Sequence, residues 1–251
     1  MPFFCFRKKS NPGVNFKTYQ EGLLKYLEDE KLSEFKKLLE HKDEYKINLD
    51  HVYGNPCYKT CLAEASKKGL TEFIKTLLKN GADPNTVCRI HLGRTAIHFA
   101  AKEGKIGAIK CLVEHPRTQI NAIDCQGDTA LHLLASNLTV DGKNAEECFS
   151  YLASLERTDV RHRNSECESA IKMAVGKCSR DIWKDVLRRR DLRPKDRQLI
   201  LDQHPELKED NRESFEAIYT YTYDDAYTDL RKKKLRDSKL NSKKNLSTRQ
   251  T

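Results

Sequence analysis

The stretch TAIHFAAKEG, residues 95–104, decides the fold because it occurs more than once in the chain. Residues 129–135 read TALHLLA, a shift of 34 residues, and residues 60–69 read TCLAEASKKG, a shift of 35 residues in the other direction. Self-similarity at a fixed period of about 20 to 50 residues is the signature of a repeat protein. The chain is therefore predicted to stack similar units rather than to wrap around one globular core.

The second half of each unit repeats as well. Residues 73–85, FIKTLLKNGADPN, align with residues 109–121, which begin IKCLVEHP and end in IN. Each unit is predicted to run helix, turn, helix, loop. A degenerate copy begins at Ser169, and a half-similar unit from Tyr19 to Asn48 has leucines at helical spacing.

The recurring residue types have physical reasons. Thr60, Thr95 and Thr129 stand where a hydroxyl can cap the first helix of a unit and pair with an otherwise free N–H group. Gly69 and Gly104 end that helix, where a left-handed conformation costs glycine least. These positions predict where each first helix begins and ends.

Two histidines recur with the motif. His98 and His132 occupy one structural position, and no acidic or thiol side chain repeats beside them. They are therefore predicted to pack and to hydrogen-bond across repeats rather than to bind a metal or act as catalytic bases.

These units resemble the ankyrin family from about Tyr19 to Leu192. The resemblance implies an all-α ankyrin-repeat solenoid of about four to five helix-turn-helix units, followed by a basic, disordered C-terminal tail. The proline usual after the capping threonine is replaced throughout, so these helix starts lose a preset backbone dihedral. The residues that replace it are Cys61, Ala96, Ala130 and Ala170.

The expected domain organisation follows from the repeats. Residues 1–15 form an N-terminal tail, 16–192 the repeat domain, 193–230 a helical extension, and 231–251 the basic tail. The approximate repeats are 19–50, 54–88, 89–124, 125–163 and 164–192.

Positive charge is concentrated at the end of the chain. The 251 residues carry a formal net charge of +9, and residues 231–251 hold nine Lys or Arg against the single acid Asp237, which leaves +1 for the rest. We therefore expect no nucleic-acid binding through the folded domain, and an electrostatic role for the tail alone. The tail could serve as a nuclear address, as a weak membrane contact, or as a solvated end. Its main basic cluster is Arg231, Lys232, Lys233, Lys234 and Arg236.

The nine cysteines lack the paired spacing that grips zinc, so they are read as free thiols in a reducing compartment. His51, Cys57 and Cys61 form the one local group of ligand-like residues, but it lacks a fourth partner. We therefore expect no metal and no cofactor. Cys88, Cys125 and Cys167 fall in or near the fingers between repeats. Two interpretations stay open for them: inert thiols, or exposed thiols that sense the redox state.

The sequence predicts neither an enzyme nor a membrane-spanning segment. No Walker A loop, HExxH, GxSxG, kinase signature or EF-hand loop occurs, which predicts that the protein is not an enzyme. No secretory signal and no stretch of about 18 apolar residues is present, so we expect a cytoplasmic location.

A narrower resemblance covers roughly the first 215 residues. Residues 134–139, LASNLT preceded by a further leucine at 133, residues 147–149, ECF, and residues 199–207, LILDQHPEL, resemble the cytosolic N-terminal region of insect painless-type transient receptor potential channels of the ankyrin subfamily. The resemblance implies a regulatory module of a calcium-permeable cation channel for thermal or mechanical nociception, on the cytosolic face of a membrane, with channel subunits as partners. The pore segments of that family do not occur in this sequence.

Binding is expected on the surface that stacking leaves free, namely the finger tips and the concave face of the inner helices. A free cytosolic or nuclear regulator or adaptor that resembles inhibitors of NF-kappa-B remains the alternative to a channel module. The residues predicted to bind a protein partner are His51, Tyr53, Lys67, Arg89, His91, Lys102, Asp124 and Gln126.

Overall fold

The computed structural model describes residues 16–53, 59–138 and 143–210, and in these ranges the regular elements are helices. The chain divides into two compact units, residues 1–179 and residues 180–251. The predicted N-terminal tail 1–15 and basic tail 231–251 lie outside the described residues.

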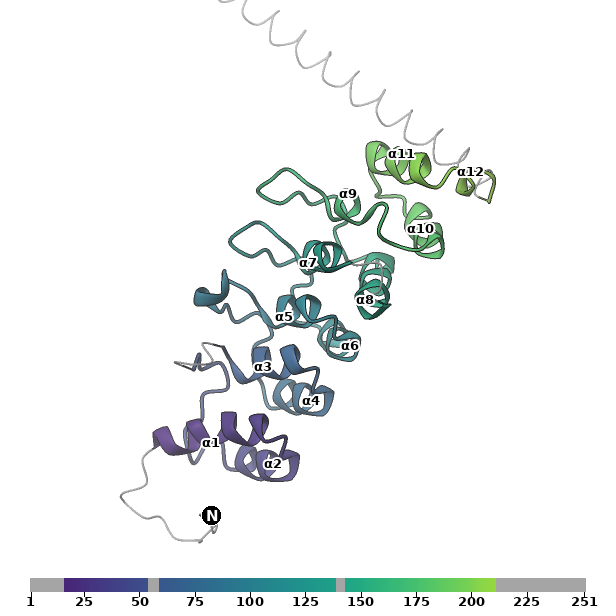
Figure 1. Ribbon diagram of the computed structural model, residues 1–251. Helices are drawn as coiled ribbons and strands as arrows, with labels where there is room; N and C mark the ends of the chain where they lie inside the picture. Colours follow the sequence, from purple (N-terminus) through teal and green to yellow (C-terminus); the bar gives the residue numbers. More distant parts are fainter. Residues whose placement is uncertain (1–15, 54–58, 139–142, 211–251) are drawn as a thin grey trace, which may run out of the picture. The chain divides into compact units, whose positions relative to one another are not determined.

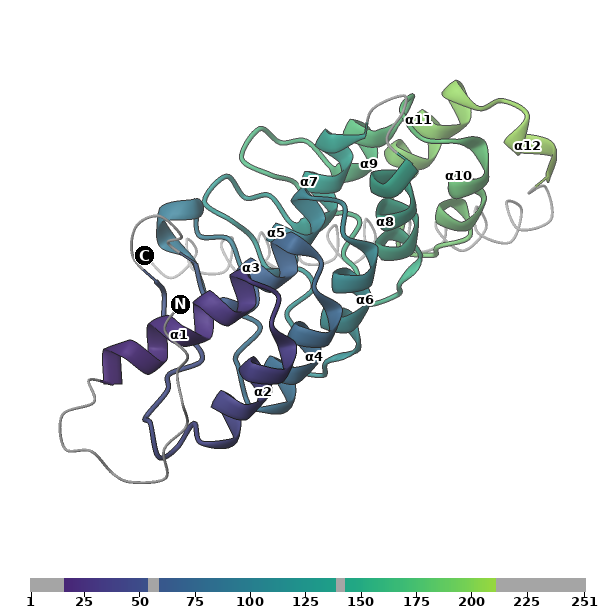
Figure 2. The same cartoon turned by 60° about the horizontal axis from the view of Figure 1, so that its bottom comes forward.

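The first unit stacks helical hairpins in two rows (Figures 1 and 2). Each inner helix contacts the next inner helix, and each outer helix contacts the next outer one. The predicted order of helix, turn, helix and loop is therefore confirmed. The inner helices are α1 (Phe16–Glu28), α3 (Cys61–Lys68), α5 (Ala96–Lys102), α7 (Ala130–Asn137) and α9 (Ala170–Ala174). The outer helices are α2 (Leu32–Glu40), α4 (Thr71–Lys79), α6 (Ile106–Glu114) and α8 (Lys143–Ser154).

The loops that join successive hairpins project to one side of the first unit as fingers (Figure 1). We define finger 1 as residues 48–59, finger 2 as 83–94, finger 3 as 119–128 and finger 4 as 159–168. Finger 2 has 12 residues and finger 3 has 10. The additional length is used for a short 3-10 helix, η1 (Arg89–His91), at the tip of finger 2.

The predicted caps account for the ends of the inner helices. The Thr60 hydroxyl accepts a hydrogen bond from the Ala63 N–H at 3.1 Å, which satisfies a donor that the helix leaves free. Gly69 ends the same helix in the left-handed conformation, with φ at 79°. The buried core between the two rows consists of branched aliphatic side chains, and each contributes about 1.5–3 kcal/mol on burial. Its fully buried members include Leu62, Ile74, Leu77, Ile97, Ile109, Leu112 and Leu131.

An asparagine ladder fixes the register of successive units. The Asn85 carboxamide accepts a hydrogen bond from the Gln119 N–H at 2.8 Å. It also donates to the carbonyl of the residue two positions before Gln119, again at 2.8 Å. Asn121 makes the same two bonds to the next unit: it accepts from the Asp159 N–H and donates to the carbonyl two positions before Asp159, each at 2.8 Å. Because each amide matches one donor and one acceptor of the next unit, a shift of one residue would break both bonds.

The ladder has defined ends. Asp50 starts it, since its carboxylate accepts from the Asp83 N–H at 2.7 Å. At the equivalent position of finger 4 the chain has Arg161, which cannot accept a hydrogen bond. The ladder therefore spans fingers 1 to 4.

The second unit contains α10 (Arg180–Leu187), α11 (Pro194–Gln203) and α12 (Leu207–Asp210). Trp183 is fully buried in this unit. The buried Arg197 guanidinium donates to the carbonyls of Leu187 at 2.6 Å and Arg189 at 2.9 Å, which satisfies acceptors at the C-terminal end of α10. The predicted boundary of the repeat domain at 192 stays a prediction.

Helix length bears on the question of membrane spans. Among the described residues the longest helix, α1, has 13 residues, and no helix there is both long and apolar enough to cross a bilayer.

Replacing Asn85 by Ala tests the ladder. The substitution removes one acceptor and one donor at the junction of two repeats, so we expect the free energy of unfolding to fall by about 1–2 kcal/mol. Urea denaturation followed by circular dichroism measures the change. The control is Gln119→Ala at the same junction, because the Gln119 main chain, not its side chain, makes the ladder bond. Equal losses in both variants would contradict the ladder.

Candidate functional site

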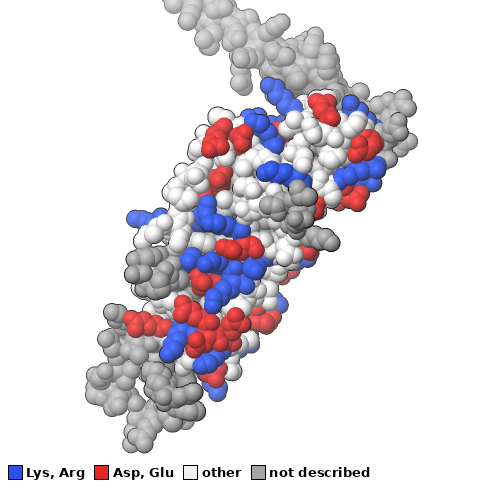
Figure 3. All heavy atoms as spheres, in the orientation of Figure 1, with Lys and Arg blue, Asp and Glu red and all other residues white. Residues whose placement is uncertain are grey.

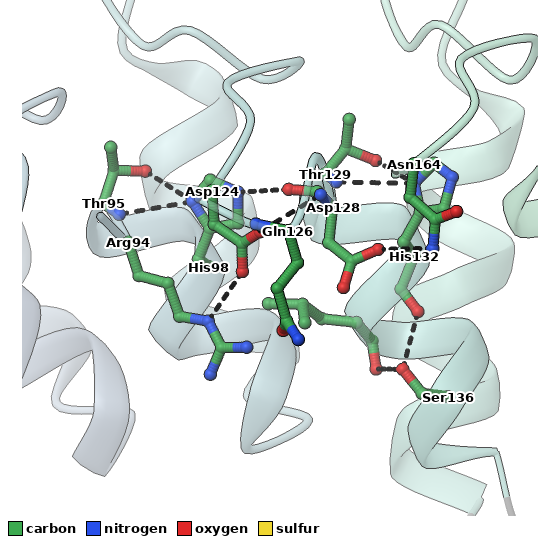
Figure 4. A network of polar contacts seen from close by, with 11 residues as sticks. Arg94, Thr95, His98, Asp124, Gln126, Asp128, Thr129, His132, Ser136 and Asn164 are labelled. Atoms are coloured by element: carbon green, nitrogen blue, oxygen red, sulfur yellow. Dashed lines mark hydrogen bonds and ion pairs between the residues drawn. The ribbon is translucent and has the colours of Figure 1, made fainter. Parts of the chain in front are cut away.

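The bases of the fingers are held by imidazoles that bridge adjacent repeats (Figure 4). His98 Nδ1 accepts from the Thr95 N–H at 3.2 Å, so the ring proton must lie on Nε2, which is 3.1 Å from the Asp128 carbonyl of finger 3. His132 repeats the arrangement, with Nε2 3.2 Å from the Glu168 carbonyl of finger 4. Each ring thus closes a helix start and ties it to the following finger, as the sequence predicts.

Burial keeps both histidines neutral. Removal from water lowers the pKa of His98 and of His132 from the ordinary value of 6.5, because the charged imidazolium loses its hydration. Since both ring nitrogens already have partners in the fold, neither histidine is free to bind a metal or to move a proton.

An ion pair and a main-chain hydrogen bond join fingers 2 and 3. Arg94 Nε donates to Asp124 Oδ2 at 3.0 Å, and both side chains are almost fully buried. The Cys125 N–H donates to the Leu92 carbonyl at 2.7 Å. The other Asp124 oxygen accepts from the Gln126 N–H at 2.8 Å, which shapes the tip of finger 3. These two fingers therefore form a pre-organised pair.

Fingers 3 and 4 are joined in a similar way. The Ser165 N–H donates to the Gln126 carbonyl at 2.9 Å, and the Asn164 carboxamide donates to the Asp128 carboxylate at 2.9 Å. The row of fingers is thus a continuous hydrogen-bonded structure from finger 2 to finger 4.

Six of the predicted contact residues have side chains that reach the surface. His51, Arg89, Lys102 and Gln126 are exposed, while Lys67 and His91 are half-buried. They lie on fingers 1 to 3 and at the ends of α3 and α5. That these accessible side chains bind a partner stays a prediction.

Two predicted contact residues are corrected, because their side chains are buried. Asp124 is 5% exposed, and its carboxylate is taken up by the Arg94 ion pair and by finger 3. Tyr53 is 5% exposed, and its hydroxyl donates to the Gln20 carbonyl at 2.8 Å. A finger position alone does not predict exposure, because the fingers also supply the groups that hold neighbouring repeats together.

Sequence reasoning missed the exposed apolar side chains of the fingers. Ile90 is 67% exposed and Ile123 is 55% exposed, values far from those of a core residue. The sequence does carry a signal, since these residues stand in loops outside any helical period. The described residues contain five exposed large apolar side chains, and all lie in fingers 1 to 3: Val52, Val87, Ile90, Leu92 and Ile123.

The cysteines differ in access to solvent. Cys125 and Cys167 are exposed, whereas Cys88 is buried and so is not available as a finger-surface thiol. Burial raises the pKa of Cys148 to about 11 and of Cys178 to about 12, because the thiolate loses its hydration.

The candidate metal ligands can be followed only in part. Cys57 lies outside the described residues, Cys61 is buried and His51 is exposed. Within the ranges that the structure describes, no three His, Cys, Asp or Glu side chains gather in a way that could hold a metal ion.

Comparison with protein families identifies the repeats. A family model described as ankyrin repeats, in three copies, matches residues 62–164. This range runs from α3 to finger 4, the part of the first unit in which the histidine bridges and the asparagine ladder occur. The all-α ankyrin-repeat solenoid predicted from the sequence is confirmed. Ankyrin repeats typically mediate protein–protein interactions.

Acidification should weaken the first unit. Below pH 6.5 the unfolded chain takes up protons on two histidines that the folded chain keeps neutral, so the free energy of unfolding falls as pH falls. Each histidine adds a slope that approaches about 1.4 kcal/mol per pH unit. Urea denaturation at a series of pH values between neutral and mildly acidic measures it. His98→Asn should reduce the slope, and an unchanged slope in this variant would contradict the assignment.

Thiol labelling should divide the cysteines by exposure. Brief treatment of the native protein with iodoacetamide at neutral pH should modify Cys125 and Cys167 first, because buried thiols with raised pKa values offer little thiolate. Peptide mass spectrometry gives the extent at each site, and denatured protein provides the control for intrinsic reactivity. Rapid native labelling of Cys148 or Cys178 would contradict the described packing.

Proposed function

We propose that this chain is a non-enzymatic scaffold that binds a protein partner through its fingers and the surface of its inner helices. One observation carries the proposal. The polar groups between repeats are used to hold the stack, whereas three solvent-accessible cations of the fingers and inner helices have no such task. The side chains of Lys67, Arg89 and Lys102 make no hydrogen bond or ion pair to any other described residue.

The distribution of charge on the surface supports the proposal. On the face shown in Figure 3, Lys and Arg side chains gather over the α3 part of the first unit, next to Asp and Glu side chains near the end of α1. Exposed acidic residues at the C-terminal end of α1 are Glu28, Asp29 and Glu30. A surface with charges of both signs at fixed places selects among partners by complementarity.

A catalytic role finds no support at the recurring motif. His98 and His132 are neutral, and both nitrogens of each ring have partners in the fold. Their recurrence is explained by stacking, so it gives no reason to assign them a reaction.

We further propose a cellular context for the scaffold. The resemblance of residues 134–139 and 199–207 to painless-type channels favours a cytosolic regulatory region whose partners are channel subunits. In-frame hydrophobic segments downstream in the transcript would support it. The alternative is a free regulator of the NF-kappa-B-inhibitor type, with Arg231, Lys232, Lys233, Lys234 and Arg236 as a nuclear address. Nuclear accumulation that is lost when residues 231–236 are deleted would support that alternative.

Charge reversal at the surface tests the binding proposal. A triple variant with Lys67→Glu, Arg89→Glu and Lys102→Glu should reduce capture of partner proteins from cells about tenfold or more, because each change replaces attraction by repulsion. Quantitative mass spectrometry of the affinity-purified full chain measures the capture, and circular dichroism confirms that the variant is folded.

A matched triple provides the control. Lys36→Glu, Lys79→Glu and Arg117→Glu change the net charge by the same amount on the outer helices and turns, and all three residues are exposed. Capture should be retained in this variant. Equal losses in both triples would mean that only the net charge matters, and retention in both would show that the surface is assigned wrongly.

A further inference from the structure

Finger 2 shows apolar side chains to solvent at its tip. Val87, Ile90 and Leu92 are 48%, 67% and 42% exposed, and Ile123 of the adjoining finger is 55% exposed. We call these four residues the finger patch. Single exposed apolar residues are common, but a group of them confined to one place marks an interaction site.

The base of finger 2 is anchored in the core. Cys88 is fully buried and packs with Ala63 and Phe99. The His91 ring lies edge-on to Phe99, with ring centroids 5.6 Å apart. The loop closes on itself through the Cys88 N–H, which donates to the Arg94 carbonyl at 2.9 Å. The tip is therefore presented by a rigid support, which lowers the entropy lost on binding.

The two parts of the patch are joined across the fingers. The Leu92 carbonyl accepts from the Cys125 N–H at 2.7 Å, two residues beyond Ile123. A β-carbon at Gly93 would lie 3.1 Å from Cys125 Sγ and 3.7 Å from Val87 Cγ1, so the fingers meet closely at that glycine. The two fingers that carry the patch are thus in direct contact beside it.

Leu92 occupies a conformation that does not favour leucine. Its φ is 58°, in the left-handed region, which is unfavourable for a residue with a β-carbon. Because the Leu92 side chain is partly exposed, it contributes only part of the stabilisation that full burial would give. Glycine would adopt this backbone without the cost, so folding alone does not explain a large apolar side chain at this position.

The charge around the patch is positive. Finger 2 has no Asp or Glu from Pro84 to Arg94, and Arg89 is exposed beside Ile90. In finger 3 the Asp124 carboxylate pairs with Arg94, and the Asp128 carboxylate accepts from the Asn164 carboxamide. Among the residues that the structure describes, Arg89 is therefore the cation at the patch that has no ion pair.

We propose that the finger patch binds a peptide segment of a partner protein in which an apolar side chain is flanked by carboxylates. The apolar side chain packs on Ile90, Leu92 and Ile123, and a carboxylate pairs with Arg89, whose planar guanidinium suits bidentate contact. This inference rests on the proposed function and names the chemistry of the partner.

A membrane surface is the less favoured occupant. Anionic lipid attracts each basic residue near the surface only weakly, so stable attachment needs several cations. The patch offers one unpaired arginine, and its apolar residues spread over two fingers rather than one inserting tip. A short peptide laid across both fingers fits this arrangement better.

Direct binding of synthetic peptides tests the proposal. Three fluorescent peptides of equal length are added to the purified full chain at physiological salt: one with leucines among glutamates, one with leucines among lysines, and one with serines among glutamates. Fluorescence anisotropy should detect binding of the leucine–glutamate peptide only. Ile90→Ser and Arg89→Glu should each weaken it about tenfold, as expected for a central anchor and its charge partner.

Two further variants separate binding from folding. Leu92→Gly relieves the left-handed leucine, so it should keep or raise the melting temperature while it weakens peptide binding. Val52→Ser makes the matched change at an exposed apolar residue of finger 1, outside the patch, and should leave the affinity within about twofold, as for a residue outside the interface.

The overturning outcomes are distinct. Equal affinity for the leucine–lysine peptide would overturn the acidic partner, and wild-type affinity in Ile90→Ser would overturn the patch. Binding to phosphatidylcholine–phosphatidylserine vesicles without peptide binding would replace the peptide by a membrane. Self-association lost in Ile90→Ser without peptide binding would replace it by a second copy of the chain. If the charge-reversal triple still abolishes partner capture, the scaffold function survives the failure of this inference.

Discussion

The structure depends on side chains that one repeat uses to complete the backbone of the next. His98 closes its own helix start and reaches the carbonyl of Asp128, and Asn85 pairs with the backbone around Gln119. Each such bond contributes only about 0.5–1.5 kcal/mol, but a buried group left without its partner costs about 1–3 kcal/mol. A repeat therefore gains these contacts only when its neighbour is folded in the right register, and this coupling makes the stack cooperative.

The same coupling explains which parts of the fold can be predicted from the sequence. The capping threonine recurs in α3, α5 and α7, the histidine in α5 and α7 and the terminal glycine in α3 and α5, and this pattern predicts the three inner helices. Tyr53 and Asp124 show where the pattern gives no guidance. Both stand in finger sequences that look solvent-facing, yet each is buried by a partner distant in the sequence, Gln20 or Arg94. Exposure in a finger depends on contacts between repeats, and periodicity within one repeat does not encode them.

Different groups within the fingers serve the stacking of repeats and the recognition of a partner. Main-chain groups and buried polar side chains hold finger 2 against finger 3, and this leaves the outer side chains without a structural task. A finger held from below can present Arg89 and Ile90 without spending binding energy to order the loop. The additional residues of finger 2 raise its tip as η1 while Cys88 keeps the base in the core. Local insertion thus creates a distinctive surface without altering the stack.

Finger 4 shows how the asparagine ladder comes to an end. It copies finger 3 closely, since Asn164 takes the role of Asp124 and its side chain accepts from two main-chain N–H groups of its own finger. Two substitutions mark the difference. Cys167 occupies with φ at 60° the position that Gly127 occupies at 72°, which costs a residue with a β-carbon backbone strain. Arg161 replaces the ladder amide with a side chain that can only donate. The backbone shape of the repeat is thus retained in finger 4 while its forward link is lost, so the ladder stops within the first unit because of side-chain chemistry rather than a change of fold.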